Sequence, residues 1–131
     1  MHDIKVYSLA LDGKTALSRH FKAREFRSRD GADPIFVSPR LVELVENIRC
    51  HFGRPLVITS GYRTPRHNAA IGGAAHSQHL YGRAADIVVW GVSPERVADY
   101  AETLMPRSGG VGRYRGFTHV DVRDTKARWR G

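Results

Sequence analysis

The chain has 131 residues, a formal net charge of +8 and a single cysteine. This length suits one domain over residues 1–131, and 41% hydrophobic against 26% charged residues exclude an intrinsically disordered chain, because the apolar surface is large enough to offset the ordering entropy. A lone cysteine excludes an internal disulfide and a cysteine-rich zinc module, so we expect any metal to be bound by His, Asp or Glu.

The first residues carry neither the charged nor the apolar region of a signal peptide, and no stretch approaches the roughly 18 apolar residues of a membrane span. We therefore expect a protein made in the cytoplasm without a leader and without a membrane span. The basic balance favours polyanionic partners such as nucleic acid, anionic lipid or a teichoic-acid-bearing wall. A merely solubilising surface explains the charge equally well.

In the first third of the chain, alternation from Ile4 to Leu11 allows a strand with apolar residues on both faces. The basic segment 21–31 holds two aromatics and predicts a short helix over the core. Ser38 and Pro39 then predict the N-cap and first position of a longer helix that Gly53 ends. Its apolar stripe faces the core and consists of Leu41, Leu44, Val45, Ile48 and Phe52.

The rest of the chain alternates strands and helices without a regular βαβ pattern. Strands are predicted at 56–59, 84–90, 111–114 and 117–122, and Ser93-Pro94 opens a helix that ends before Pro106. This mixture favours the α+β class. Three aromatic residues are predicted to pack in the interior: Trp90, Tyr100 and Trp129.

Candidate metal ligands surround the second of these strands. His79 and Asp86 lie seven positions apart, so they converge only if Gly82 bends a loop into the strand that carries Asp86. His119 shares a strand face with Asp121, and an adjacent strand would bring it to the pair. Two imidazoles and one carboxylate leave a fourth tetrahedral position for water, as in catalytic zinc sites, whereas the alternative is a hydrogen-bonded His–Asp pair.

The sequence around these residues resembles a known family. Residues 38–123 are similar to the zinc D-Ala-D-Ala carboxypeptidases, whose superfamily includes lysostaphin-like endopeptidases and the hedgehog signalling domain. The closest resemblance is to their compact His-x-Asp subgroup, through Ser60–Pro65, Asn68, Gly72-Gly73, and the run from Gly110-Val111-Gly112-x-Tyr114 to His119-Val120-Asp121. The shared signature Ser-x-His-x-x-Gly-x-Ala-x-Asp is satisfied completely by Ser77, His79, Gly82, Ala84 and Asp86.

The resemblance implies a small central antiparallel sheet with flanking helices and a zinc site at the sheet. It implies that His79, Asp86 and His119 bind Zn²⁺, and that Arg63 binds a carboxylate or carbonyl of a peptide substrate. A guanidinium at a strand end suits this role because its planar pair of donors matches a carboxylate. The alternative for Arg63 is a surface arginine paired with a local acid.

The sequence departs from the family at the general base. Many relatives carry an acid three residues, or a His two residues, before the last zinc ligand, and those positions hold Gly116 and Phe117 here. Asp121 and His76 are the available proton acceptors. For Asp121 we favour a different role, as the partner that fixes the tautomer of the neighbouring imidazole.

The resemblance implies a monomeric zinc peptidase that hydrolyses peptidoglycan stem peptide, as a D-Ala-D-Ala carboxypeptidase or a murein endopeptidase. The basic surface suits an anionic cell wall, and a short chain without a leader resembles phage or prophage endolysins that are released by lysis. The alternative is a zinc-stabilised wall-binding module without catalysis, which Gly116 favours. A nucleic-acid binder is disfavoured because no helix-turn-helix, zinc-finger or aromatic RNA-binding pattern is found.

Overall fold

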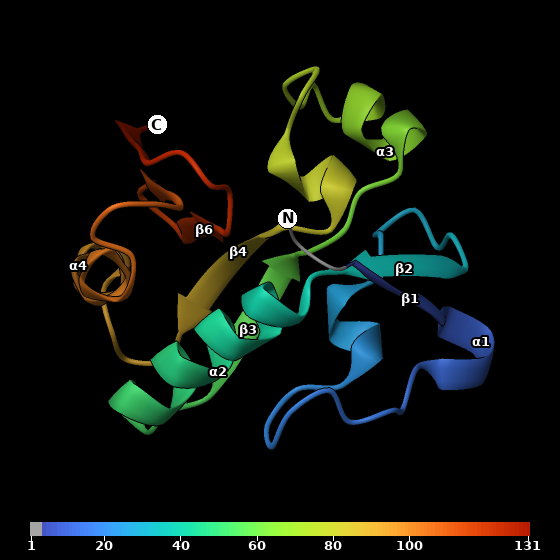
Figure 1. Ribbon diagram of the computed structural model, residues 1–131, viewed down its shortest axis with the longest axis horizontal. Coiled ribbons are helices and arrows are strands. Elements are labelled where there is room, and N and C mark those ends of the chain that lie inside the picture. Colours follow the sequence, from blue (N-terminus) through green and yellow to red (C-terminus); the bar gives the residue numbers. More distant parts are fainter. Residues whose placement is uncertain (1–3) are drawn as a thin grey trace.

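The computed structural model describes residues 4–131. Helices and strands are mixed along the chain, as expected for the α+β class (Figure 1). This described part contains four α-helices, seven strands and two short 3₁₀ helices, η1 and η2. Their order is β1 (Lys5–Ser8), α1 (Leu9–Asp12), η1 (Ala23–Phe26), β2 (Pro34–Val37), α2 (Pro39–Phe52), β3 (Leu56–Ser60), α3 (Pro65–Ala70), η2 (Gln78–Tyr81), β4 (Ala84–Val89), α4 (Pro94–Leu104), β5 (Gly110–Arg113), β6 (Thr118–Asp121) and β7 (Ala127–Arg130).

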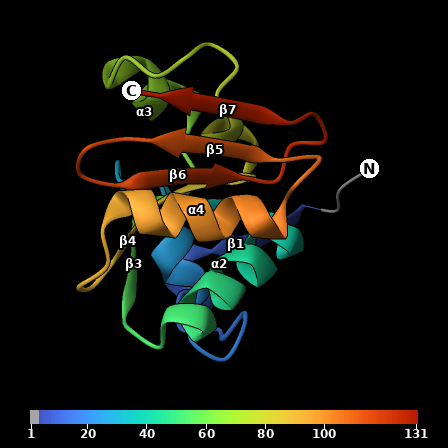
Figure 2. The same ribbon diagram turned by 90° about the vertical axis from the view of Figure 1, so that its left-hand side faces the viewer.

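The main sheet has five strands in the order β3-β4-β6-β5-β7. Neighbours in the first four strands are antiparallel, which confirms the expected central antiparallel sheet. The last strand differs, because β7 pairs with β5 in parallel, with Gly110 opposite Ala127 and Arg113 opposite Arg130. Figure 2 shows β6, β5 and β7 side by side, next to α4.

A second, two-stranded sheet pairs β1 with β2 in antiparallel register, from Lys5 opposite Val37 to Ser8 opposite Pro34. The first strand is shorter than the alternation from Ile4 to Leu11 predicts. It ends at Ser8 because this side chain caps the short helix α1, where Ser8 Oγ accepts a hydrogen bond from Leu11 N at 3.1 Å.

Helices α2 and α4 begin where the serine-proline pairs predict. The Ser38 hydroxyl accepts from Arg40 N and the Ser93 hydroxyl from Arg96 N, while Gly53 ends α2 in the left-handed conformation (φ 63°). The two helices pack against β4, β5 and β6. The hydrophobic core lies between these helices and the sheet. It contains the apolar stripe of α2, Val97, Ala98 and Ala101 of α4, and Ala85, Ile87, Val89, Val111 and Val120 of the sheet.

Because side chains alternate across a strand, the residues between these core positions face the other side of the sheet. Asp86 lies between Ala85 and Ile87, and His119 and Asp121 flank Val120. The segment from α3 to β4 lies on the opposite side of β4 from α2 (Figures 1 and 2). The fold therefore places candidate ligands on the sheet face away from α2 and α4.

Tyr100 and Trp90, two of the three aromatic residues predicted to pack inside, differ in their burial. Tyr100 is partly buried against the core, as predicted. The prediction for Trp90 is wrong, because this side chain is 66% exposed. Trp90 follows β4 directly, and the turn at Gly91 (φ 71°) takes the chain away from the sheet before the indole can pack inside.

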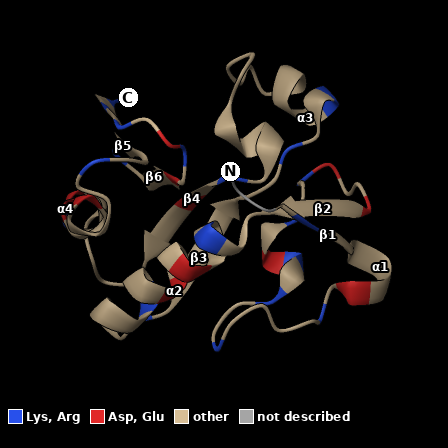
Figure 3. Cartoon of the chain, viewed as in Figure 1, with Lys and Arg blue, Asp and Glu red and all other residues tan. Residues whose placement is uncertain are grey.

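Charged residues of both signs are spread over the described chain. Lys and Arg lie on loops and helix ends throughout, and acidic residues lie on α1, α2 and α4 (Figure 3). Within residues 4–131, none of the helices has the length and apolar character needed to cross a bilayer. The expectation about a leader rests partly on residues 1–3, which lie outside the described part.

Candidate metal centre

His79 reaches the sheet from η2, the 3₁₀ helix that precedes β4. The Ser77 hydroxyl caps this helix by accepting from His79 N at 3.3 Å. Gly82 then turns the chain into β4 in the left-handed conformation (φ 69°), and a Cβ there would also strike the Phe36 carbonyl. The bend that the sequence predicts at Gly82 is confirmed, and it brings the His79 ring back over the strand.

Asp86 and His119 are directly opposite each other on the antiparallel strands β4 and β6. Asp86 Oδ1 lies 3.1 Å from His119 Nδ1 and 3.3 Å from His79 Nε2. The three residues are 7%, 7% and 2% exposed, respectively. The structure thus brings the three predicted ligands together in a buried cluster.

The hydrogen bonds on the far side of each imidazole identify the ring nitrogens that carry protons. His79 Nδ1 lies 2.7 Å from the Gly61 carbonyl, which can only accept, so Nδ1 donates and Nε2 keeps its lone pair. His119 Nε2 lies 2.8 Å from Asp121 Oδ2, so Nε2 donates and Nδ1 keeps its lone pair in the neutral ring. Both lone pairs face the Asp86 carboxylate.

Three electron-pair donors therefore converge, with their ligand atoms all within 4.8 Å of one another. Two neutral imidazoles and a carboxylate repel one another unless a cation or an added proton lies between them. Tetrahedral zinc with bonds of about 2.0–2.2 Å separates its N and O ligands by about 3.4 Å, close to the two distances at Asp86. The donor set fits a divalent metal of the zinc class.

The electrostatics of the cluster agree with this arrangement. Burial raises the pKa of Asp86, but hydrogen bonds from His119 and His79 outweigh this effect and hold the pKa of the carboxyl group well below its usual range. Burial lowers the pKa of His119, but its hydrogen bonds to Asp121 and Asp86 outweigh that effect and raise it. The raised pKa of His119 reflects the two carboxylates beside the ring, and their negative charge equally favours a bound cation.

Asp121 is fully buried and saturated with donors. Its Oδ1 accepts from Gly110 N at 2.9 Å, from Arg123 N at 3.1 Å and from Arg123 Nε at 2.8 Å. Its Oδ2 accepts from His119 Nε2 at 2.8 Å and from Arg123 Nη2 at 2.7 Å. Burial raises its pKa, but the bonds from His119 and Arg123 lower it well below the usual range. This carboxylate positions the imidazole and is a poor proton acceptor.

Gly110 and Gly112 make room for these groups on the same face of β5. A Cβ on Gly110 would collide with the Asp121 carboxylate. A Cβ on Gly112 would lie 2.6 Å from Cε2 of Trp129, which covers β5 from the parallel strand β7. The Trp129 ring centroid lies 4.9 Å from that of His119. The two glycines of this Gly-x-Gly motif therefore lie within strand β5 and leave space for Asp121 and Trp129, and they do not form a turn.

A cavity of about 450 Å³ opens over the three ligands. Two other residues singled out in the sequence line it, Arg63 and the exposed His76, whereas Asp121 is shielded beneath His119. Sequence reasoning missed the lining residues Ala74 and Arg123, which carry no local signal. The further lining residues are Gly72, Gly73, Ala74, Ser77, Gln78, Tyr114, Phe117, Arg123 and Trp129.

Arg63 is held at the rim by three different acceptors. Its Nε donates to Ser60 Oγ at 3.1 Å, Nη1 to Asn68 Oδ1 at 3.3 Å and Nη2 to Asp86 Oδ2 at 3.4 Å. Burial lowers the pKa of this guanidinium, and the Asp86 charge opposes the effect. Each terminal nitrogen keeps a second N–H, which leaves a pair of donors for an incoming carboxylate or carbonyl.

Comparison with known proteins gives two findings. A family model described as Peptidase M15 matches residues 16–121, which include every residue of the cluster. The chain is also similar to a Haemophilus influenzae protein named "Probable peptidoglycan L,D-endopeptidase MepK", with 33% identity over 105 residues that cover 72% of this chain and 55% of that protein. The chain thus spans about half the length of this relative.

Proposed function

Because the chain belongs to the peptidase M15 family, we propose that it hydrolyses a peptide bond in peptidoglycan stem peptide with the help of one zinc ion. The observation that carries the proposal is the convergence of three lone-pair donors, from His79, Asp86 and His119, at the floor of a cavity. Peptidases of this family are metal dependent, and the relative named above supplies the substrate class.

The proposed division of labour assigns binding to the cation and to Arg63. His79, Asp86 and His119 would hold the zinc ion, which would supply Lewis-acid polarisation of the scissile carbonyl and a lowered pKa for the attacking water. Arg63 orients the peptide through its two remaining N–H groups, either on a terminal carboxylate or on a carbonyl beside the scissile bond. Its fixed contacts with Ser60 and Asn68 hold the guanidinium in place before substrate arrives.

The proton acceptor in this proposal is His76. Of the two candidates, Asp121 accepts five hydrogen bonds within the protein and has no exposed surface, so it does not reach the water. His76 is exposed and lines the cavity. An imidazole is the side chain that most often acts as a general base in enzymes.

The test is hydrolysis of purified peptidoglycan and of a synthetic stem peptide ending in D-Ala-D-Ala, with products identified by mass spectrometry. Activity should disappear on chelation and return with zinc. Release of one D-Ala would make the protein a carboxypeptidase, and an internal cut would make it an endopeptidase. His76→Ala should lower kcat by about 10²–10⁴-fold and leave zinc content unchanged.

Arg63 separates the two modes of substrate binding. If it binds a terminal carboxylate, Arg63→Ala should raise KM for the free acid and have little effect on the same peptide with an amidated end. If it binds an internal carbonyl, both peptides should lose activity equally. Unchanged turnover of both would remove Arg63 from the proposed site.

The second candidate function is a zinc-stabilised module that binds the wall without cleaving it, which the absence of an acid at Gly116 favours. This candidate predicts protein that holds zinc at this centre, sediments with purified peptidoglycan and gives no product from either substrate. In that case His76→Ala should leave wall binding unchanged.

A further inference from the structure

A second group of metal-ligating side chains lies apart from the centre described above, where the loop 16–22 meets α2. A nitrogen of His20, a carboxylate oxygen of Glu46 and the sulfur of Cys50 lie within 4.8 Å of one another. Glu46 and Cys50 are four residues apart in α2 and so share one face of the helix. His20 belongs to a tight loop in which Phe21 O accepts from Leu17 N at 2.8 Å.

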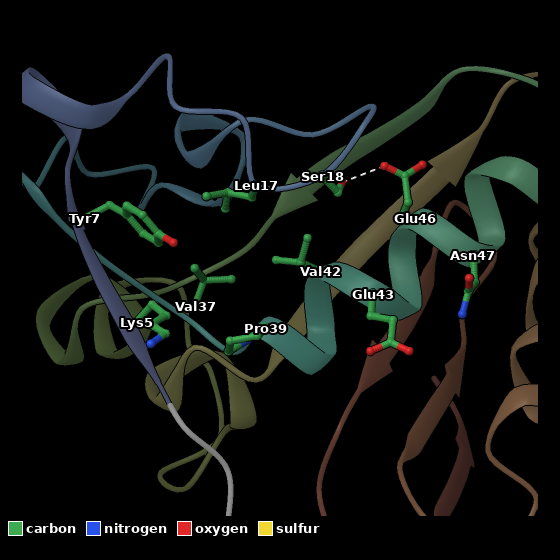
Figure 4. A pocket seen from close by; sticks show the side chains of 10 residues that line it. All are labelled: Lys5, Tyr7, Leu17, Ser18, Val37, Pro39, Val42, Glu43, Glu46 and Asn47. Carbon is green, nitrogen blue, oxygen red and sulfur yellow. Dashed lines mark hydrogen bonds between the residues drawn. The ribbon is translucent and has the colours of Figure 1, made fainter.

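The Glu46 carboxylate is held at one oxygen and shared at the other. Its Oε1 accepts from Ser18 Oγ at 2.5 Å and from His20 N at 2.7 Å. Figure 4 shows the Ser18 contact at the edge of a separate pocket, beside α2. Its Oε2 lies 2.6 Å from His20 Nδ1 and 3.4 Å from Cys50 Sγ. Hydrogen bonds to Oε1 thus fix the carboxylate, while its Oε2 lies next to an imidazole nitrogen and a thiol.

From this geometry we propose that His20, Glu46 and Cys50 bind a second metal ion of the zinc class, which ties the loop 16–22 to α2. One thiolate, one imidazole and one carboxylate suit zinc or cobalt and disfavour the oxygen-seeking Mg²⁺ and Ca²⁺. On binding, the thiol proton is released to solvent and the thiolate sulfur binds the metal. The proton that His20 Nδ1 donates to Glu46 in the metal-free protein moves to Nε2, so that the Nδ1 lone pair of the neutral imidazole also binds the metal. Water completes the coordination.

The cluster needs little rearrangement to hold an ion. Tetrahedral ligands with bonds of about 2.0–2.3 Å stand about 3.3–3.8 Å apart, which the Cys50–Glu46 distance of 3.4 Å already meets. The His20–Glu46 pair must open from 2.6 Å, which requires the imidazole, with 29% of its side chain exposed, to turn towards solvent. Ser18 then keeps the role of an outer hydrogen bond that orients the ligating carboxylate.

Cobalt titration of the reduced, metal-free protein tests the proposal, because Cys50 is the only sulfur ligand that the chain can offer as a thiolate. Two equivalents should bind, and one of them should produce a sulfur-to-cobalt charge-transfer band in the near ultraviolet. Cys50→Ser should abolish this band, lower the metal count in native mass spectrometry from two to one, and leave peptidase activity unchanged. His119→Ala should lose the other ion and keep the band.

Variants of the residues around Cys50 test whether the cobalt is bound by all three side chains or by the thiol alone. His20→Ala and Glu46→Gln should each weaken the band-forming affinity by tenfold or more, and Ser18→Ala by about tenfold, because it loosens the carboxylate without removing a ligand. Glu43→Gln is the matched control, since it removes the same charge from α2 at a residue that belongs to the neighbouring pocket and not to the cluster. It should leave the band unchanged.

Three results would overturn the proposal. The first is a reduced protein without a charge-transfer band at saturating cobalt. The second is a band whose affinity is the same in His20→Ala and Glu46→Gln as in the parent protein. The third is a band that grows with the square of the protein concentration, which means that thiols of two copies share the ion.

Discussion

Replacing Asp121 with Asn tests whether the buried carboxylate prepares His119 for the metal. Three donors meet Oδ1 and two meet Oδ2, so the single amide oxygen goes to the Oδ1 side and the amide nitrogen faces His119 Nε2. Two donors cannot face each other, and the ring therefore moves its proton to Nδ1. That atom lies 3.1 Å from Asp86 Oδ1 and is the one required to bind the ion.

The expected loss follows from this tautomer change. Removing a hydrogen-bond partner behind a ligating imidazole costs about 10–100-fold in metal affinity, or about 1.4–2.7 kcal/mol. Zinc affinity of the Asp121→Asn protein should fall by this factor in competition with a chromophoric chelator. Peptidase activity should return in part when zinc is raised to saturation, because the ligands themselves remain.

Asp99→Asn is the matched control, because it makes the same charge change at an α4 side chain that is 68% exposed and pairs with Arg113. Its zinc affinity should equal that of the parent protein. The reasoning fails if Asp121→Asn binds zinc within twofold of the parent, or if Asp99→Asn loses as much. A thermal melt of each metal-free protein shows whether lost folding, and not lost affinity, explains the result.

Three further predictions use stability. Gly112→Ala should destabilise the protein by about 1–3 kcal/mol in urea titrations and shift tryptophan fluorescence, because the new Cβ would lie 2.6 Å from Trp129 Cε2; an unchanged midpoint and spectrum would contradict the close packing. Burial raises the pKa of Glu46, but hydrogen bonds from Ser18 and His20 outweigh it and lower it from 4.5 to about 2. The ionised Glu46 carboxylate therefore stabilises the fold fully above pH 4.5, and this contribution is lost as the pH falls towards 2. Between these pH values the free energy of unfolding of metal-free Glu46→Gln should fall less than that of the parent protein; parallel plots of the two free energies against pH would refute this. Free zinc at 100 times its Kd should add about 2.7 kcal/mol to the free energy of unfolding, and chelation should remove it in a calorimetric scan.

Local signals predicted the long helix well. The Ser38 cap, Pro39 and the left-handed Gly53 are each readable from the sequence, and α2 has the predicted bounds. The resemblance to D-Ala-D-Ala metallopeptidases is confirmed by the family match over residues 16–121. That the cluster binds zinc stays a prediction, since the geometry shows only that its three donors converge.

The missed elements depend on contacts between distant parts of the chain. Strand β7 pairs with β5, and its sequence Ala127–Arg130 lacks a hydrophobic alternation that would predict a strand. Trp129 was expected to pack in the interior, and its place beside His119 follows only from this pairing and from the gap at Gly112. No local pattern carries that information.

The centre rests on two different structural supports. Alternation along β4 sends Ile87 and its core neighbours towards α2 and α4 and sends Asp86 to the other face, so core packing also fixes Asp86 opposite His119. A slip of one residue would bury the carboxylate against apolar side chains, which makes this register strongly specified. His79 lies outside the strands and is positioned by the Ser77 cap, the turn at Gly82 and the hydrogen bond from its Nδ1 to the Gly61 carbonyl. The strand pair is therefore preorganised by the core, and changes in η2 should alter metal affinity while leaving the fold intact.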